Sequence, residues 1–170
     1  SFNRSIFLED IDINCNAKNK GGIKKVVLGL QRDLTVNLDP SDETLVTNVE
    51  LVRSVNFEHN NRDSATTFNE SKTNNNGLGV VTTDIIVRLP MLDRKLNKLD
   101  YMSRRNDIVA ILYYNNDTAM VCGWMDGLTM NYNATSNTRP TELSYVDVTL
   151  TTDSWISSLA VEDTGIIQLP

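Results

Sequence analysis

The 170-residue chain lacks the features that mark several large classes of protein. No apolar run reaches the ~18 to 20 residues of a membrane-spanning helix, and the first residues lack the apolar stretch of a signal peptide. His59 is the single histidine, which limits general-base chemistry. Cys15 and Cys122 lie too far apart in sequence for a metal knuckle or a CxxC pair. We therefore expect no membrane segment, no metal, no cofactor and no catalytic centre.

Positive charge is also scarce, and its scarcity is uneven. Sixteen Lys and Arg residues stand against 22 Asp and Glu residues, which gives a net charge of −6. Residues 106–170 hold one basic residue, Arg139, and eight acidic ones. An acidic chain argues against a protein that grips nucleic acid by its phosphates. The asymmetry predicts a surface of a single sign within one domain.

Apolar residues at every second position dominate the first half of the chain and predict β-strands. Residues 44–57 alternate over their whole length, which predicts one long half-buried strand, and residues 79–89 repeat the pattern. Shorter strands are expected at residues 11–15, 26–30 and 34–38.

The final third reads as a meander of further strands. Residues 108–114 are apolar at consecutive positions, as in a strand covered on both faces. A turn at residues 115–117 leads to a returning strand at 119–125. Asp126-Gly127 is a strong hairpin signal, because the favoured two-residue turn needs positive φ at both positions. Residues 128–132 and 145–151 complete the expected meander.

Two segments depart from the period of two. Leu92, Leu96, Leu99 and Met102 recur at helical spacing, which predicts an amphipathic helix at about 91–105. Residues 58–77 form a long polar excursion, either a mobile loop or an extended hairpin. The expected fold is mainly β: a single domain over residues 1–170, built as an antiparallel β-sandwich or half-barrel with one helix.

Few side chains suggest chemistry, and each has a plainer interpretation. His59 lies among polar residues and fits the surface, whereas the two cysteines fit buried free thiols. Asp10 and Asp12 share one strand face but lack the spacing of a calcium loop. Trp124 lies on a core-patterned strand and is interpreted as structural. Trp155 follows the last strand and is expected to pack the tail down.

Three stretches, in their order along the chain, resemble the tail tube protein family of bacteriophages. This family shares its fold with the tube proteins of type VI secretion systems and with tail ring adaptors. The stretches are Gly21-Gly22-Ile23-Lys24-Lys25, then Ile108-Val109-Ala110-Ile111-Leu112 with Cys122-Gly123-Trp124-Met125-Asp126-Gly127-Leu128, and finally Val146-Asp147-Val148-Thr149-Leu150.

The resemblance implies a structural virion protein that forms a homo-oligomeric ring of six copies. The sheets of the copies would join into one inner barrel, which removes the open edges of a half-barrel. Stacked rings would channel DNA. Residues 58–77 would form an inter-subunit arm, with Arg62, Thr66, Phe68 and Lys72 as its candidate contacts. Such a protein assembles in the host cytoplasm and contacts sheath, tape-measure, adaptor or baseplate proteins.

A channel for DNA needs a wall to which DNA does not adhere. Basic residues in the wall would bind phosphates and release counterions, whereas carboxylates repel them. We therefore expect some of Asp117, Asp126, Asp147 and Asp153 to line the channel.

Two other classes of function stay open from the sequence. A carbohydrate-binding β-sandwich, such as a capsid or fibre decoration domain, would need an exposed aromatic platform, for which Trp124, Trp155 and the tyrosines are available. A small β-fold enzyme would have only His59 and scattered carboxylates to work with.

Overall fold

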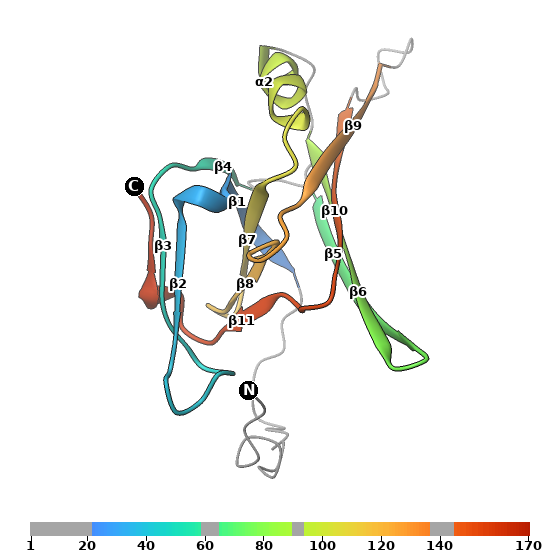
Figure 1. The fold of residues 1–170 in the computed structure, drawn as a ribbon. Helices are drawn as coiled ribbons and strands as arrows, with labels where there is room; N and C mark the ends of the chain where they lie inside the picture. The colour runs from blue at the N-terminus through green and yellow to red at the C-terminus, as the bar shows by residue number, and fades with distance from the viewer. Residues whose placement is uncertain (1–21, 59–64, 90–93, 137–144) are drawn as a thin grey trace.

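The computed structural model describes residues 22–58, 65–89, 94–136 and 145–170. They form twelve strands, one α-helix and two short 3-10 helices, η1 (Gln31–Asp33) and η2 (Thr164–Ile166). The strands make three sheets that stand side by side in Figure 1. Every pairing is antiparallel except that of β12 with β3. The described residues form no closed barrel, and the predicted β-sandwich with one helix is confirmed.

The central sheet has five strands in the order β11-β8-β7-β1-β4. Their bounds are Leu159–Val161, Ala119–Cys122, Ile108–Tyr114, Ile23–Leu30 and Val55–Glu58. Six of the seven residues of β7 are buried, because the two faces of the strand enter different cores. Ala110 and Leu112 belong to one core, and Val109 and Ile111 belong to the other. The prediction of a strand covered on both faces is confirmed.

A four-stranded sheet packs against one face of the central sheet, on the right in Figure 1. Its order is β5-β6-β10-β9, and the bounds are Ala65–Asn75, Leu78–Leu89, Tyr145–Ser154 and Thr129–Thr135. Ile85, Val148 and Leu150 from this sheet meet Val26 and Leu112 from the central sheet. The period of two in residues 79–89 therefore correctly predicts the buried face of β6.

A three-stranded sheet covers the opposite face of the central sheet. Its order is β12-β3-β2, with bounds Ile167–Gln168, Val46–Leu51 and Leu34–Leu38. Val49 and Leu51 pack with Val27 and Ile111 to form the second core. The molecule therefore has three β layers, with the most apolar sheet in the middle.

The helix α2 (Arg94–Ser103) lies beside β9, near one end of the space between the central and four-stranded sheets (Figure 1). Leu99 is buried, and Leu96 and Met102 pack against the same core, as the helical spacing predicts. Asp100 pairs with Arg104 at 3.0 Å and accepts a hydrogen bond from the Tyr132 hydroxyl on β9. This polar contact supplements the apolar packing that fixes the helix to the sheet.

The prediction of one long strand over residues 44–57 is wrong, because the chain changes sheet at residues 52–54. β3 ends at Leu51 in the three-stranded sheet, and β4 begins at Val55 in the central sheet. Val49 and Phe57 share the alternation but contact different cores. Alternation records which residues are covered and does not record which layer covers them.

The hairpin predicted at Asp126-Gly127 is also wrong. β8 pairs with β7 and β11, whereas β9 pairs with β10, so the chain crosses between sheets here. Gly123 and Gly127 both have positive φ, and the Gly127 N–H donates to the Gly123 carbonyl. The two glycines make a tight turn that redirects the chain, and the expected meander is therefore two hairpins joined by a crossover.

Residues 65–77 of the polar excursion form an extended hairpin, one of the two alternatives open from the sequence. β5 and β6 pair continuously from Ala65 opposite Arg88 to Asn75 opposite Leu78. Asn76 and Gly77 connect them with φ values of 52° and 82°. Positive φ at both turn residues is what a two-residue hairpin favours, and Asn-Gly is its strongest sequence signal. Residues 59–64 lie outside the described part of the chain.

Candidate functional site

One face of the four-stranded sheet is not covered by either core, and we call it the open face. Its residues are those between the buried positions of each strand, and most are Thr, Asn, Ser or Asp. On the two central strands they are Thr82, Asp84, Ile86 and Arg88 of β6 and Tyr145, Asp147, Thr149, Thr151 and Asp153 of β10. The result is a broad, mostly polar surface, on which Ile86, Arg88 and Tyr145 are the larger side chains of the two central strands.

Neither edge strand of this sheet pairs with a further strand among the described residues, and α2 lies beside β9. β5 runs for eleven residues in uninterrupted register with β6, and it contains neither a proline nor a bulge. Its single lysine, Lys72, lies toward the hairpin end. β9 is the other edge strand and has an equally regular register with β10. Long regular edges of this kind are templates for pairing with another strand.

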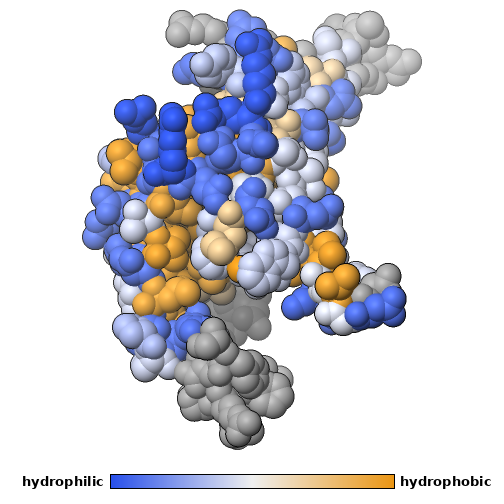
Figure 2. Space-filling model, in the orientation of Figure 1, coloured by the Kyte–Doolittle hydropathy of each residue, from blue (hydrophilic) through white to orange (hydrophobic). Residues whose placement is uncertain are grey.

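The end of the β5–β6 hairpin projects from the body of the molecule and carries apolar side chains. Leu78 is 75% exposed and Val80 is 46% exposed. Figure 2 shows the projection at the lower right, with hydrophobic atoms on a part that stands clear of the body. Gly77 at the turn has nothing within 4 Å of where a Cβ atom would be. An exposed apolar tip of this kind is typical of a contact surface.

Arg88 is the one basic residue among the described open-face positions of the four strands, and its charge is already paired with a carboxylate. Its guanidinium donates two hydrogen bonds to the Asp147 carboxylate, at 2.8 and 3.0 Å, and lies 4.0 Å from the centre of the Tyr145 ring. These bonds raise the pKa of Arg88 and lower the pKa of Asp147. Bidentate pairing and stacking together fix a guanidinium in place.

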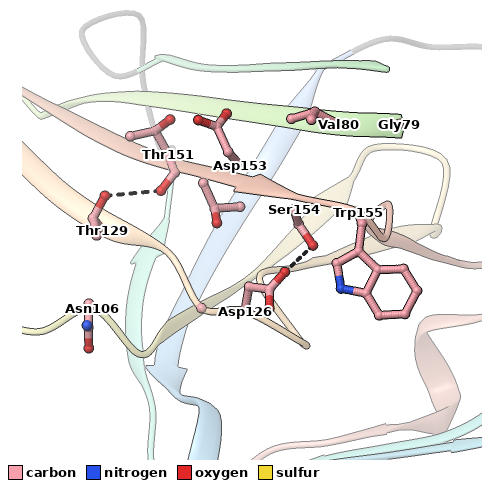
Figure 3. Close-up of a pocket in the computed structure, with 11 residues that line it drawn as sticks. Gly79, Val80, Asn106, Asp126, Thr129, Thr151, Asp153, Ser154 and Trp155 are labelled. Carbon is pink, nitrogen blue, oxygen red and sulfur yellow. Dashed lines mark hydrogen bonds between the residues drawn. The ribbon is translucent and has the colours of Figure 1, made fainter. Parts of the chain in front are cut away.

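The structure brings together two of the four candidate acidic residues, Asp126 and Asp153, and places a third, Asp147, farther along the same face. Asp147 and Asp153 lie on the open face of β10, and Asp153 accepts a 2.9 Å hydrogen bond from the Thr82 hydroxyl. Asp126 lies in the turn before β9 and accepts a hydrogen bond from the Ser154 hydroxyl. Asp126 and Asp153 line one cavity at the end of the sheet (Figure 3).

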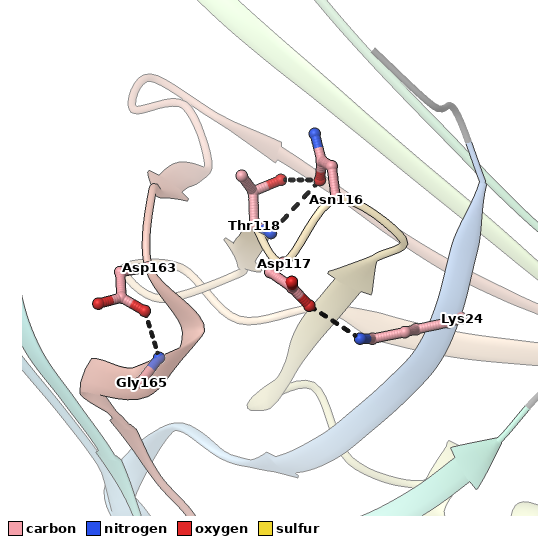
Figure 4. Close-up of polar contacts among 6 residues, drawn as sticks. All are labelled: Lys24, Asn116, Asp117, Thr118, Asp163 and Gly165. Atoms are coloured by element: carbon pink, nitrogen blue, oxygen red, sulfur yellow. Dashed lines mark hydrogen bonds and ion pairs between the residues drawn. The ribbon is translucent and has the colours of Figure 1, made fainter. Parts of the chain in front are cut away.

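Asp117 lies elsewhere, in the turn between β7 and β8 of the central sheet. Its φ is 63°, and its carboxylate pairs with Lys24 at 3.3 Å (Figure 4). Asn116 accepts hydrogen bonds from Thr118 in the same turn. The left-handed conformation and the Asn side chain account for the turn locally, and Asp117 does not belong to the open face.

The candidate arm residues divide between the body and the projection. Phe68 is half-buried and packs on the chain's own core, on the same side of β5 as Thr66. Lys72 is exposed near the hairpin end. Arg62 lies outside the described residues. Phe68 therefore holds the base of the hairpin to the body, and the projecting part begins after it.

Glu70 anchors the hairpin to the C-terminal segment, a contact that the sequence did not suggest. Its carboxylate accepts hydrogen bonds from the Thr83 hydroxyl at 2.8 Å and from the Ser158 hydroxyl at 2.6 Å. The Ser158 N–H also donates to it. A half-buried carboxylate with several donors is satisfied in place, and it fixes the direction in which the hairpin leaves the body.

The other candidate side chains have structural roles or lie outside the described residues. Burial raises the pKa of the Cys122 thiol to about 12, so the thiol stays protonated. Trp124 is half-buried and its Nε1 donates to the Ser157 carbonyl, which fits the structural interpretation. The described residues contain no group of side chains that could hold a metal ion and no helix long and apolar enough for a bilayer. Four other candidates, Cys15, His59, Asp10 and Asp12, lie outside the described residues.

The expectation for Trp155 is wrong. The indole is 69% exposed and lies beside the Asp126–Ser154 hydrogen bond at the mouth of the cavity (Figure 3). Leu159 and Val161 hold the tail by forming β11 against β8 instead. Alternation predicts that a residue faces outward but does not predict whether anything covers that face.

Comparisons with protein-family models, with curated proteins and with solved structures find no match for this chain.

Proposed function

We propose that the chain is a structural subunit that associates with copies of itself, edge to edge, into the ring of a phage tail tube or tail ring. The observation that carries this proposal is the four-stranded sheet with two long, regular edges, β5 and β9, that have no further strand partner in the described part of the chain. Monomeric proteins blunt such edges with prolines, bulges or lysines. Pairing with another copy satisfies the free N–H and C=O groups instead.

The strand directions are compatible with a ring. Each strand in β5-β6-β10-β9 is antiparallel to its neighbour, and the number of strands is even. The outer strands β5 and β9 therefore run in opposite directions. When β9 of one copy meets β5 of the next by rotation about a common axis, the junction is again antiparallel. A head-to-tail contact of this type closes when the rotation closes.

The size of such a ring suits a channel. Six copies, the number that the resemblance implies, would place six four-stranded sheets side by side. At ~4.8 Å between strands the circumference is about 115 Å and the diameter about 37 Å, and strand tilt widens both. A barrel of this diameter is wider than a DNA double helix.

The open face has the chemistry of a wall along which DNA can slide. Its single described cation, Arg88, is held by Asp147 and Tyr145, and the remaining charges there are carboxylates. DNA phosphates therefore meet no free cation among the described open-face residues. Without a cation to displace them, the counterions of the DNA are not released, and this source of affinity is missing. We assign Asp147 and Asp153 to the channel wall, with Asp126 at its rim.

The projecting hairpin supplies the contact between stacked rings. Leu78 and Val80 expose apolar surface beyond the body of the molecule, where a neighbouring ring can cover it. The proposed partners are therefore further copies of the chain, and at the ends of the stack the sheath, tape-measure, adaptor or baseplate proteins of a virion. No catalytic step is proposed.

The test begins with the mass of the purified chain, measured by light scattering and negative-stain microscopy over rising concentration. Rings or tubes are expected, and a stable monomer at millimolar concentration would refute the proposal.

Two proline variants then test the β5 edge itself. Consecutive N–H groups of an edge strand point alternately inward and outward, so Ser71→Pro and Lys72→Pro differ in which one they remove. The variant that loses an outward N–H should keep its circular dichroism and thermal midpoint but lose ring formation. Lys72→Ala controls for the loss of the lysine side chain. If Ser71→Pro and Lys72→Pro both fold and both still assemble like the wild type, β5 is excluded as the junction.

A further inference from the structure

A cavity of about 690 Å³ opens at the end of the open face, between the projecting end of the hairpin and the turn before β9. Its volume lies within the ~300–1,000 Å³ of small-molecule sites. Most of its lining side chains carry hydroxyl, amide or carboxylate groups, and Trp155 forms its one aromatic wall (Figure 3).

Trp155 offers an unoccupied aromatic face. The side chain is 69% exposed, whereas the other tryptophan, Trp124, is half-buried and bonded to Ser157. An indole face carries the negative side of a quadrupole and attracts the positive edge of a C–H group. A pyranose ring presents several C–H groups on one face, so it can lie flat against such a surface.

The two carboxylates that line the cavity are oriented by the protein and keep acceptor capacity; Asp126 lies beside the indole, whereas Asp153 points to the other side of β10 (Figure 3). Asp126 accepts from the Ser154 hydroxyl through one oxygen, and Asp153 accepts from the Thr82 hydroxyl through one oxygen. The Thr129 hydroxyl is fixed by donating to the Thr151 carbonyl at 3.2 Å. An ionised carboxylate has about four acceptor sites, so both acidic residues can accept hydrogen bonds from further hydroxyls.

We propose that this cavity binds a neutral saccharide, with one sugar ring stacked on Trp155 and its hydroxyls donating to Asp126. None of the described residues that line the cavity is Lys, Arg or His, and the two carboxylates repel anions, so phosphates and acidic sugars are disfavoured. A purely apolar ligand would leave the polar groups without partners. The site does not depend on the proposed ring, because all the groups that it uses belong to one copy.

The experiment uses the soluble, unstacked fraction of the full chain on an array of neutral hexose and N-acetylhexosamine oligosaccharides. Sialylated and sulfated glycans, a short single-stranded DNA and choline serve as competing probes. Affinity for the best neutral oligosaccharide is then measured by calorimetry. Trp155→Ala should weaken it by roughly tenfold or more, and Trp155→Phe should recover part of the loss because a ring remains.

Tyr101→Ala is the matched control, because Tyr101 is also 69% exposed and lies on α2 outside the cavity lining. This variant should bind like the wild type. Asp126→Asn keeps the shape of the cavity and should weaken binding through the lost charge-assisted hydrogen bonds.

Three results would overturn the proposal. The first is an array without neutral glycan binding while the protein is folded by circular dichroism. The second is preference for the anionic glycans, DNA or choline. The third is neutral glycan binding that Trp155→Ala leaves unchanged, which would place the site elsewhere. None of these results bears on ring formation, which is measured by mass.

Discussion

Leu78→Ser should separate ring formation from ring stacking. Leu78 is 75% exposed at the projecting hairpin end. Full burial of a leucine side chain contributes ~1.5–3 kcal/mol, so covering the exposed part contributes about 1–2 kcal/mol for each contact. This is roughly a 5- to 30-fold change in the dissociation constant of each contact. Every subunit of a ring makes the contact, so the losses add across the stack.

The measurement is sedimentation velocity with negative-stain microscopy of wild type and variant at equal concentrations. Leu78→Ser should give rings of unchanged diameter without tubes. Its stability should change by less than about 0.5 kcal/mol, because the side chain makes few contacts in the single chain. Val52→Ser, at a 56% exposed apolar residue between β3 and β4, is the control and should still form tubes. Tubes of normal length from Leu78→Ser would refute the assigned role of the hairpin end.

Three further predictions test the architecture and the open face. Gly127→Ala should lower the free energy of unfolding by about 2–4 kcal/mol in chemical denaturation, because φ is +75° and a Cβ would lie 2.5 Å from the Asn106 carbonyl oxygen. Gly77→Ala is the control: its φ is +82° but the space around it is open, so the free energy of unfolding should fall by only about 1–2 kcal/mol. Asp147→Asn should free Arg88 and increase retention on DNA at low salt. The pKa of Asp147 is lowered in the folded state, so its ion pair with Arg88 stabilises the fold by about 0.2–1 kcal/mol above the ordinary value of 3.8. This contribution is lost as pH falls through the lower pKa of the folded state. The stabilities of the wild type and of Asp147→Asn should therefore converge at that pH. Iodoacetamide followed by peptide mapping should label Cys122 only after denaturation, because the thiol is buried and its pKa is raised to about 12.

Much of the fold could be predicted because burial leaves a direct trace in the sequence. The strand at residues 108–114 was predicted with its observed bounds, since a strand between two cores must be apolar at every position. The helix was located from Leu96, Leu99 and Met102, which contact one core. Local pairs such as Asp100 with Arg104 also follow from spacing alone.

The errors in the fold share one physical cause. Val49 and Phe57 are both covered, but in different cores, and the turn at Gly127 redirects the chain to another sheet instead of returning it. Alternation reports burial without naming the covering layer. The hairpin turn at Asn76-Gly77 had a clear local signal, which the polar residues around it obscured.

The candidate site was less predictable than the fold, because it consists of surfaces that nothing covers. The acidic residues of β10 could be placed on an outward face by their alternation with Val146, Val148 and Leu150. The exposure of Trp155 and the engagement of Arg88 depend on which strands become neighbours. That arrangement follows from long-range pairing, which a period of two does not specify.

The hairpin end and the saccharide cavity share a side chain, so the two proposals constrain each other. Val80 belongs to the apolar tip and also lines the cavity beside Trp155. A ring docked on the tip would therefore narrow or close the cavity mouth, and saccharide would bind freely only at the exposed end of a stack. The number of saccharides bound per subunit should then be lower in wild-type tubes than in Leu78→Ser rings, as measured by calorimetry at equal subunit concentration. Equal binding by tubes and rings would mean that the tip docks without approaching the cavity, and the contact between rings would have to be assigned to another surface.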